Sequence, residues 1–172
     1  MFIDLGLLIL RLVLGFLFIG HGAQKLFGWF GGPGMKGVTG WLGSMGMRPA
    51  WFWALMAGLS EFGGGVLLVL GFLSPLGSLG IIAAMLVAIN KAHLSKGLWN
   101  SNGGYEFPLM NIAAALAIGL AGAGAYSLDA MIGFALPEPV ALTVGIVLVI
   151  VGLVTSVATE APKPAQTAPR AS

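Results

Sequence analysis

Charged side chains able to carry proton chemistry lie inside apolar stretches of this 172-residue chain. An ionised group at the centre of a bilayer costs about 3 kcal/mol on insertion scales, so each one needs a partner or a function. Glu61 lies deep in one apolar run, and Arg11 lies in the run before it. We expect an Arg11–Glu61 ion pair that holds the structure together. The alternative is that Glu61 has a tuned proton affinity and exchanges protons.

A second set of polar residues gathers towards one membrane face. His21, Gln24 and Lys25 have the spacing i, i+3, i+4, which places them on one side of a helix. Three further segments bring polar groups to the same face, namely Asn90, Lys91, His93, Asn102, Tyr105, Glu106 and Asn111. This asymmetry favours a shared polar pocket. A solvated interface with snorkelling lysines is the alternative.

The two histidines allow two cofactor interpretations. His21 and His93 lie at similar depth in different runs, and paired haem ligation would need them to face each other across a cavity as wide as a porphyrin. A metal site made of His21, His93 and either Glu61 or Glu106 would have suitable ligand types, but the sequence has no E-x-x-H motif on a helix to support it. We therefore expect hydrogen-bonding histidines, no metal and no intrinsic cofactor. Because the chain has no cysteine, thiolate chemistry and cysteine-held clusters are excluded, and any redox work needs a borrowed cofactor.

The elements that position these residues are membrane helices. The chain is 58% hydrophobic and 8% charged, whereas soluble domains have about 25% charged residues. We predict an all-α membrane protein: a four-helix transmembrane bundle with an additional C-terminal fifth transmembrane helix. The four helices cover about 5–27, 51–73, 77–96 and 109–123 within one membrane domain (1–133), the extra helix covers 138–158, and 159–172 form a disordered tail. We expect a loop up to Pro49 and a tight turn at Ser74-Pro75.

Cation placement predicts the orientation. Seven of the eight cations fall on one side of a five-span topology, with Arg11 on the other, and the seven are Lys25, Lys36, Arg48, Lys91, Lys96, Lys163 and Arg170. By the positive-inside rule, the loops 28–50 and 97–108 and the C-terminus are cytoplasmic. The net charge of +2 forms no basic patch, so the lipid bilayer is an expected partner and nucleic acid is not.

Several motifs together resemble the DoxX/DoxD family of bacterial membrane proteins, over about Leu5 to Gly133. They are Arg11-Leu12 with Gly15, His21-Gly22-x-x-Lys25-Leu26-Phe27-Gly28, Glu61-Phe62-x-Gly64-Gly65, the run from Asn102 to Leu109, and Gly124-Ala125-Tyr126-Ser127-Leu128-Asp129. The resemblance implies a four-helix inner-membrane module, in some members a subunit of thiosulfate:quinone oxidoreductase and in others a membrane partner in redox-stress complexes. The fifth helix and the tail depart from that pattern. The implied site positions are Arg11, His21, Lys25, Glu61, Asn102, Tyr105 and Glu106.

Two functional hypotheses follow, and they leave open whether the chain is an enzyme. In the first, the chain is a subunit or partner of a membrane redox complex acting with quinone. His21, Lys25 or Tyr105 then binds the quinone oxygens, and Glu61 or Glu106 exchanges protons. The surrounding substrate-binding residues are Arg11, Gln24, Asn90, Lys91, His93 and Asn102. A soluble or membrane redox subunit, or a small anion near the lysines, supplies electrons. In the second, the chain is a non-enzymatic membrane scaffold or small-solute carrier.

Overall fold

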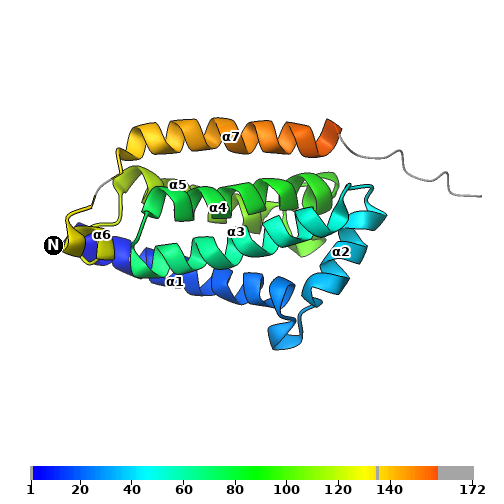
Figure 1. The fold of residues 1–172 in the computed structure, drawn as a ribbon, viewed down its shortest axis with the longest axis horizontal. Coiled ribbons are helices and arrows are strands. Elements are labelled where there is room, and N and C mark those ends of the chain that lie inside the picture. The colour runs from blue at the N-terminus through cyan, green and yellow to red at the C-terminus, as the bar shows by residue number, and fades with distance from the viewer. Residues whose placement is uncertain (1, 135, 159–172) are drawn as a thin grey trace, which may run out of the picture.

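The computed structural model describes residues 2–134 and 136–158, apart from the side chain of Glu138, and the elements in these ranges are helical (Figure 1). The predicted tail at 159–172 lies outside the described residues. In chain order the elements are α1 (Phe2–Leu26), η1 (Trp29–Gly31), α2 (Gly34–Ser44), α3 (Ala50–Leu70), α4 (Ser74–Ala88), the π-helical turn η2 (Ile89–His93), η3 (Leu94–Lys96), η4 (Asn100–Asn102), α5 (Glu106–Ala121), α6 (Leu128–Ile132) and α7 (Glu138–Ala158).

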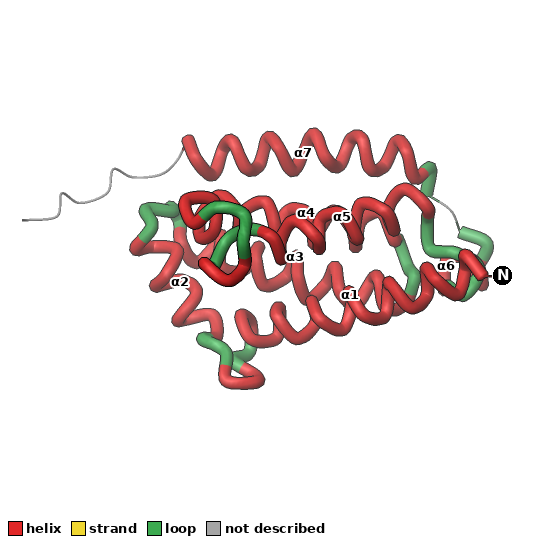
Figure 2. The backbone as a smooth tube through the Cα atoms, turned by 180° about the vertical axis from the view of Figure 1, so that it is seen from behind, coloured by secondary structure: helices red, strands yellow, loops and turns green. Residues whose placement is uncertain are grey.

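Four helical segments in the described ranges are long and apolar enough to cross a membrane: Phe2–Leu26, Ala50–Leu70, Ser74–Lys96 and Pro139–Ala158. The apolar helix α5 has 16 residues and is shorter. At 1.5 Å per residue it covers about 24 Å of an approximately 30 Å hydrocarbon layer. Helices α1, α3, α4 and α5 pack side by side, and α7 runs along the outside of this bundle (Figures 1 and 2). The predicted class, an all-α membrane protein, is confirmed.

The expected loop before Pro49 contains a helix, which corrects the sequence prediction. Val38 and Leu42 are one turn apart on α2, and both are buried against Met47 and Ala54. The loop prediction was wrong because glycine recurs every three residues from Gly34 to Gly43, a composition typical of turns. Packing of the apolar side of α2 outweighs that local preference. Helix α2 lies across one end of the bundle (Figure 1).

Two helices begin earlier than predicted because proline is tolerated in a first helical turn, where the N–H that it lacks would have no intrahelical acceptor. Helix α4 starts at Ser74 with Pro75 in its first turn, where we expected a tight turn. Helix α5 starts at Glu106, and Pro108 lies within its first turn.

Glycines set the contact between the antiparallel helices α1 and α3. A Cβ atom added to Gly22 would lie 2.6 Å from Phe62 Cα, and one added to Gly65 would lie 2.6 Å from the carbonyl oxygen of Gly15. Such close backbone approach is the usual role of small residues in membrane helices. The contacts fix the register, because Gly15 lies beside Gly65 and Gly22 lies beside Phe62.

We expect Gly22→Ala and Gly65→Ala to lower the free energy of unfolding by about 1–3 kcal/mol each, since the added methyl group must push the helices apart. Gly20→Ala and Gly63→Ala are matched controls on the same helices, because a Cβ atom there meets nothing within 4 Å. The measurement is the melting temperature in detergent. Equal melting of Gly22→Ala and Gly20→Ala would contradict the glycine contact.

Candidate functional site

A cavity of about 550 Å³ lies among the end of α1, α2, α3, the α4–η2 segment and α7. This volume is within the range of small-molecule sites, about 300–1,000 Å³. Its walls are mostly apolar and aromatic, and they include Val38, Trp41, Leu42, Met47, Phe52, Trp53, Met56, Val87, Val149 and Leu153. Four polar or charged side chains also line it: Lys25, Ser60, Glu61 and His93. The cavity therefore suits a largely apolar molecule with a polar group.

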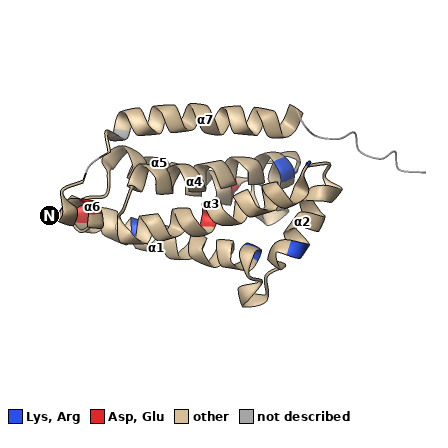
Figure 3. Ribbon diagram, viewed as in Figure 1, with Lys and Arg blue, Asp and Glu red and all other residues tan. Residues whose placement is uncertain are grey.

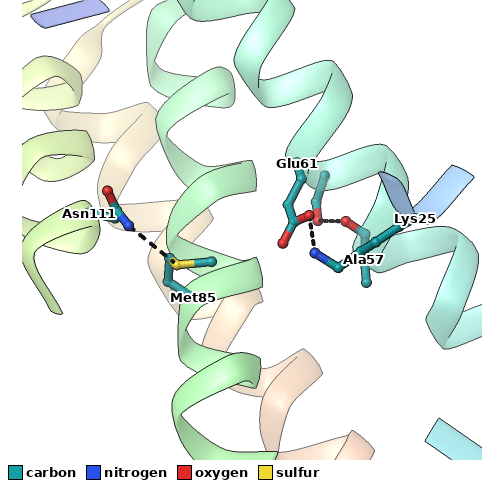
Figure 4. Close-up of polar contacts among 6 residues, drawn as sticks. Lys25, Ala57, Glu61, Met85 and Asn111 are labelled. Atoms are coloured by element: carbon teal, nitrogen blue, oxygen red, sulfur yellow. Dashed lines mark hydrogen bonds and ion pairs between the residues drawn. The ribbon is translucent and has the colours of Figure 1, made fainter. Parts of the chain in front are cut away.

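An ion pair between α1 and α3 supplies the charge of the cavity. Lys25 Nζ donates a hydrogen bond to Glu61 Oε2, and the two side chains point towards each other (Figure 4). Lys25 lies one turn after Gly22, and Glu61 directly precedes Phe62, so the glycine contact brings them to the same level. The Glu61 side chain is 5% exposed and that of Lys25 is 25% exposed. The carboxylate is thus the deeper charge and depends on the lysine for compensation.

The expected Arg11–Glu61 ion pair is wrong. Arg11 Nη1 donates to the carbonyl oxygen of Ala123, and Nη2 donates to that of Tyr126 at 2.7 Å. Arg11 is 14 residues before Lys25 on the same helix, which at 1.5 Å per residue separates them by about 21 Å. Glu61 lies at the level of Lys25, so Arg11 is too far along α1 to reach it.

The polar residues at the Arg11 end connect distant segments of the chain. Arg11 is 1% exposed and holds the segment between α5 and α6. Asp129 Oδ1 accepts a hydrogen bond from Leu73 N at 3.2 Å, and Asp4 Oδ1 accepts one from Ala125 N at 3.1 Å. These contacts give Arg11 a structural role, remote from the cavity.

His93 reaches the cavity from the π-helical turn η2. Its Nδ1 lies 2.7 Å from the carbonyl oxygen of Gly103. Because a carbonyl oxygen only accepts, we assign the proton to Nδ1, which leaves the lone pair on Nε2 in the neutral ring. π-Helical turns occur frequently at functional sites. This turn links the cavity to the loop that contains Gly103.

The other candidate residues lie outside the cavity walls. His21 packs against the rings of Phe18 and Phe107, with centroid distances of 6.0 and 6.4 Å. His21 is therefore not part of the lining of the cavity that His93 reaches, so this cavity does not bring the two histidines together. Glu106 Oε2 accepts a hydrogen bond from Asn100 N at 2.9 Å and so organises its own loop. The cavity lining also leaves out Gln24, Asn90, Lys91, Asn102 and Tyr105.

Asn111, another polar residue expected at this face, is buried between α4 and α5. Its Nδ2 lies 4.0 Å from Met85 Sδ, a weak acceptor (Figure 4). Among the described residues, no group of three or more His, Cys, Asp or Glu side chains is arranged to hold a metal ion.

Sequence reasoning missed several wall residues. Ser60 adjoins Glu61 and donates a hydrogen bond to the carbonyl oxygen of Ala57 at 3.1 Å. Trp41 and Leu42 belong to the unpredicted helix α2, and Trp53 lies in the first turn of α3. The spacing of Val38 and Leu42 was the available signal for α2. No local signal places α7 against the cavity, because that contact depends on tertiary packing.

A family model described as DoxX matches residues 6–94. The match covers more than half of the chain, and it includes the three ionisable residues of the cavity: Lys25, Glu61 and His93. It ends before α5 and α7. No curated protein and no solved structure matches the chain.

Proposed function

Because this chain belongs to the DoxX family of multi-pass membrane proteins, we propose that it binds a lipid-soluble quinone as part of a membrane redox complex. The observation that carries the proposal is the Lys25–Glu61 ion pair set into an apolar, aromatic cavity. A quinone matches this chemistry, since its ring is apolar and its carbonyl oxygens accept hydrogen bonds.

Reduction of a quinone to a quinol takes up two electrons and two protons. The electrons come from a soluble or membrane redox subunit, because this chain has no cysteine to hold a cluster. Lys25 donates a hydrogen bond to one carbonyl oxygen as that oxygen gains negative charge. Lys25 transfers its proton to that oxygen, and the Glu61 carboxylate takes up a proton from the aqueous side and passes it to Lys25. The lone pair on Nε2 of His93 accepts a second proton from the aqueous side, and His93 delivers it to the other oxygen.

Titration of the purified protein in nanodiscs with a short-chain quinone tests this function. We expect binding by the wild type and a loss of about tenfold or more in the double variant Lys25→Met with Glu61→Gln, because the quinone then loses its charged hydrogen-bond donor. Lys36→Met is the matched control, since Lys36 is exposed on α2 and does not line the cavity. A wild type that binds no quinone would contradict the proposal.

The exposed loop after η2 supports the alternative of a scaffold. Trp99 is 62% exposed, and Lys96, three residues earlier in the chain, is also exposed. Under this alternative, a partner protein docks on the loop, and Trp99→Ala abolishes its recovery from membranes. Quinone titration separates the two functions, because a scaffold retains its partner without binding quinone.

We further propose a location in the bacterial inner membrane with the α2 end in the cytoplasm. The ribbon segments coloured for Lys and Arg lie mostly towards that end of the bundle, and a segment coloured for Asp and Glu lies at the end near α6 (Figure 3). The cation bias predicts this orientation.

Since the chain has no cysteine, single introduced cysteines report the orientation directly. We expect an impermeant maleimide to label Ala130→Cys at the α6 end in cells with a permeabilised outer membrane, and to leave Lys36→Cys and Lys96→Cys unlabelled until the inner membrane is opened. These three positions are exposed, so access alone decides the result. Labelling of position 36 or 96 but not of position 130 would reverse the orientation.

A further inference from the structure

One face of α7 is turned towards the bundle. Leu142, Gly145, Val149, Gly152 and Ser156 follow the alternating spacing of three and four residues that aligns side chains on a helix. Leu142 and Ser156, at the two ends of this series, are 2% and 1% exposed. The face between them therefore points inwards, towards α4 and the cavity.

Two glycines on this face have different surroundings. A Cβ atom added to Gly145 would lie 2.8 Å from Leu79 Cδ2, so α7 packs tightly on α4 there. A Cβ atom added to Gly152, two turns later, meets nothing within 4 Å. Gly152 lines the cavity together with Val149 and Leu153. The space next to Gly152 thus belongs to the cavity and is unfilled by neighbouring side chains.

The cavity has a polar part and an apolar part on different elements. Its ionisable residues come from α1, α3 and η2, whereas α7 contributes only Val149, Gly152 and Leu153. Helix α7 is also the least buried of the spanning segments, with 11% of its apolar window buried against 39% for the α4 segment. A molecule that extends from Lys25 and Glu61 to α7 therefore ends next to lipid.

From these contacts, and resting on the proposed function, we propose that Gly152 keeps open a binding site for an apolar tail. The ligand class is then a lipid-soluble molecule whose polar ring meets Lys25 and Glu61 while its tail lies against α7 between Val149 and Leu153. A small water-soluble solute would gain nothing from this apolar end. The tail site is supplied by a helix outside the part of the chain that the family model matches.

The test compares a quinone that carries two isoprenoid units with the same ring without a tail, both titrated into the protein in nanodiscs. We expect Gly152→Trp to weaken binding of the tailed quinone by about tenfold or more, the effect of excluding about two methylene groups from an apolar site. Binding of the tail-free ring stays within about threefold of the wild type. Gly152→Leu should weaken binding of the tailed quinone less than Gly152→Trp does, because the leucine side chain is smaller than that of tryptophan.

Val151→Trp is the matched control, because Val151 neighbours Gly152 and is 56% exposed. It should bind both quinones as the wild type does, and melting temperatures confirm that each variant is folded. The tail site is overturned if the Gly152→Trp variant binds the tailed quinone as tightly as the wild type does. It is also overturned if this variant binds both quinones more weakly by the same factor. If the wild type binds neither quinone, the proposed function fails and the tail site fails with it. If the Lys25→Met, Glu61→Gln variant loses both quinones while the Gly152 variants lose neither, only the tail site fails.

Discussion

Lys25→Met should lower the free energy of unfolding by about 3–5 kcal/mol, because it leaves the Glu61 carboxylate buried without a counter-charge. Glu61→Gln should cost less, since the Lys25 side chain is 25% exposed and can turn its ammonium group outwards, whereas the Glu61 side chain is 5% exposed. Unfolding curves in detergent measure both values. The expected order of stability is wild type, Glu61→Gln and then Lys25→Met.

The double variant Lys25→Met with Glu61→Gln separates stability from function. It removes both charges, so most of the stability lost in Lys25→Met should return, and the double-mutant cycle should give a favourable coupling energy. It should still bind quinone about tenfold or more weakly than the wild type. Lys36→Met, which removes an exposed lysine, should unfold like the wild type. A double variant that melts no higher than Lys25→Met would contradict the ion pair.

Arg11→Lys should destabilise the protein by about 3 kcal/mol. The planar guanidinium donates to two carbonyl oxygens at once, those of Ala123 and Tyr126, and an ammonium group does not reproduce that fork. Each hydrogen bond from a charged group contributes about 1.5–3 kcal/mol. Hydrogen exchange provides a local measurement, because amides of the segment between α5 and α6 should exchange faster. Arg48→Lys is the control, since Arg48 is exposed. An Arg11→Lys variant as stable as this control would contradict the stabilising role of the two hydrogen bonds from Arg11.

The helices were predictable because their apolar runs are long. Arg11, Lys25 and Glu61 were identifiable as candidate site residues because they are charged and lie inside these runs. Their pairing was predicted wrongly, because the helix bounds alone point to the wrong partner. Glu61 lies near the middle of α3, whereas Lys25 lies at the end of α1, so the depth of Arg11 matches that of Glu61 better in the sequence. Glycine contacts then fix the register, and such contacts are visible only in three dimensions.

The walls of the cavity were less predictable than its charges. Helix α2 is rich in glycine, so its composition resembles a loop, and its few buried side chains become informative only once packed against α3. His21 and Lys25 lie one turn apart on α1, yet the flexible lysine reaches towards α3 while the His21 ring lies near Phe107 of α5. The spacing of these residues on one helix face therefore predicted the correct end of the bundle. It did not predict which neighbouring helix each side chain contacts.

Photoaffinity labelling with an azido-quinone, followed by mass spectrometry of the labelled peptides, tests the central claim most directly. A quinone bound beside Lys25 and Glu61 should label the cavity walls, chiefly the segments 53–60 of α3 and 149–153 of α7, and excess unlabelled quinone should suppress the labelling. The Lys25→Met, Glu61→Gln variant should lose most of it. Labelling that concentrates near His21 and Phe107 instead, or that unlabelled quinone does not reduce, would contradict a quinone site in this cavity.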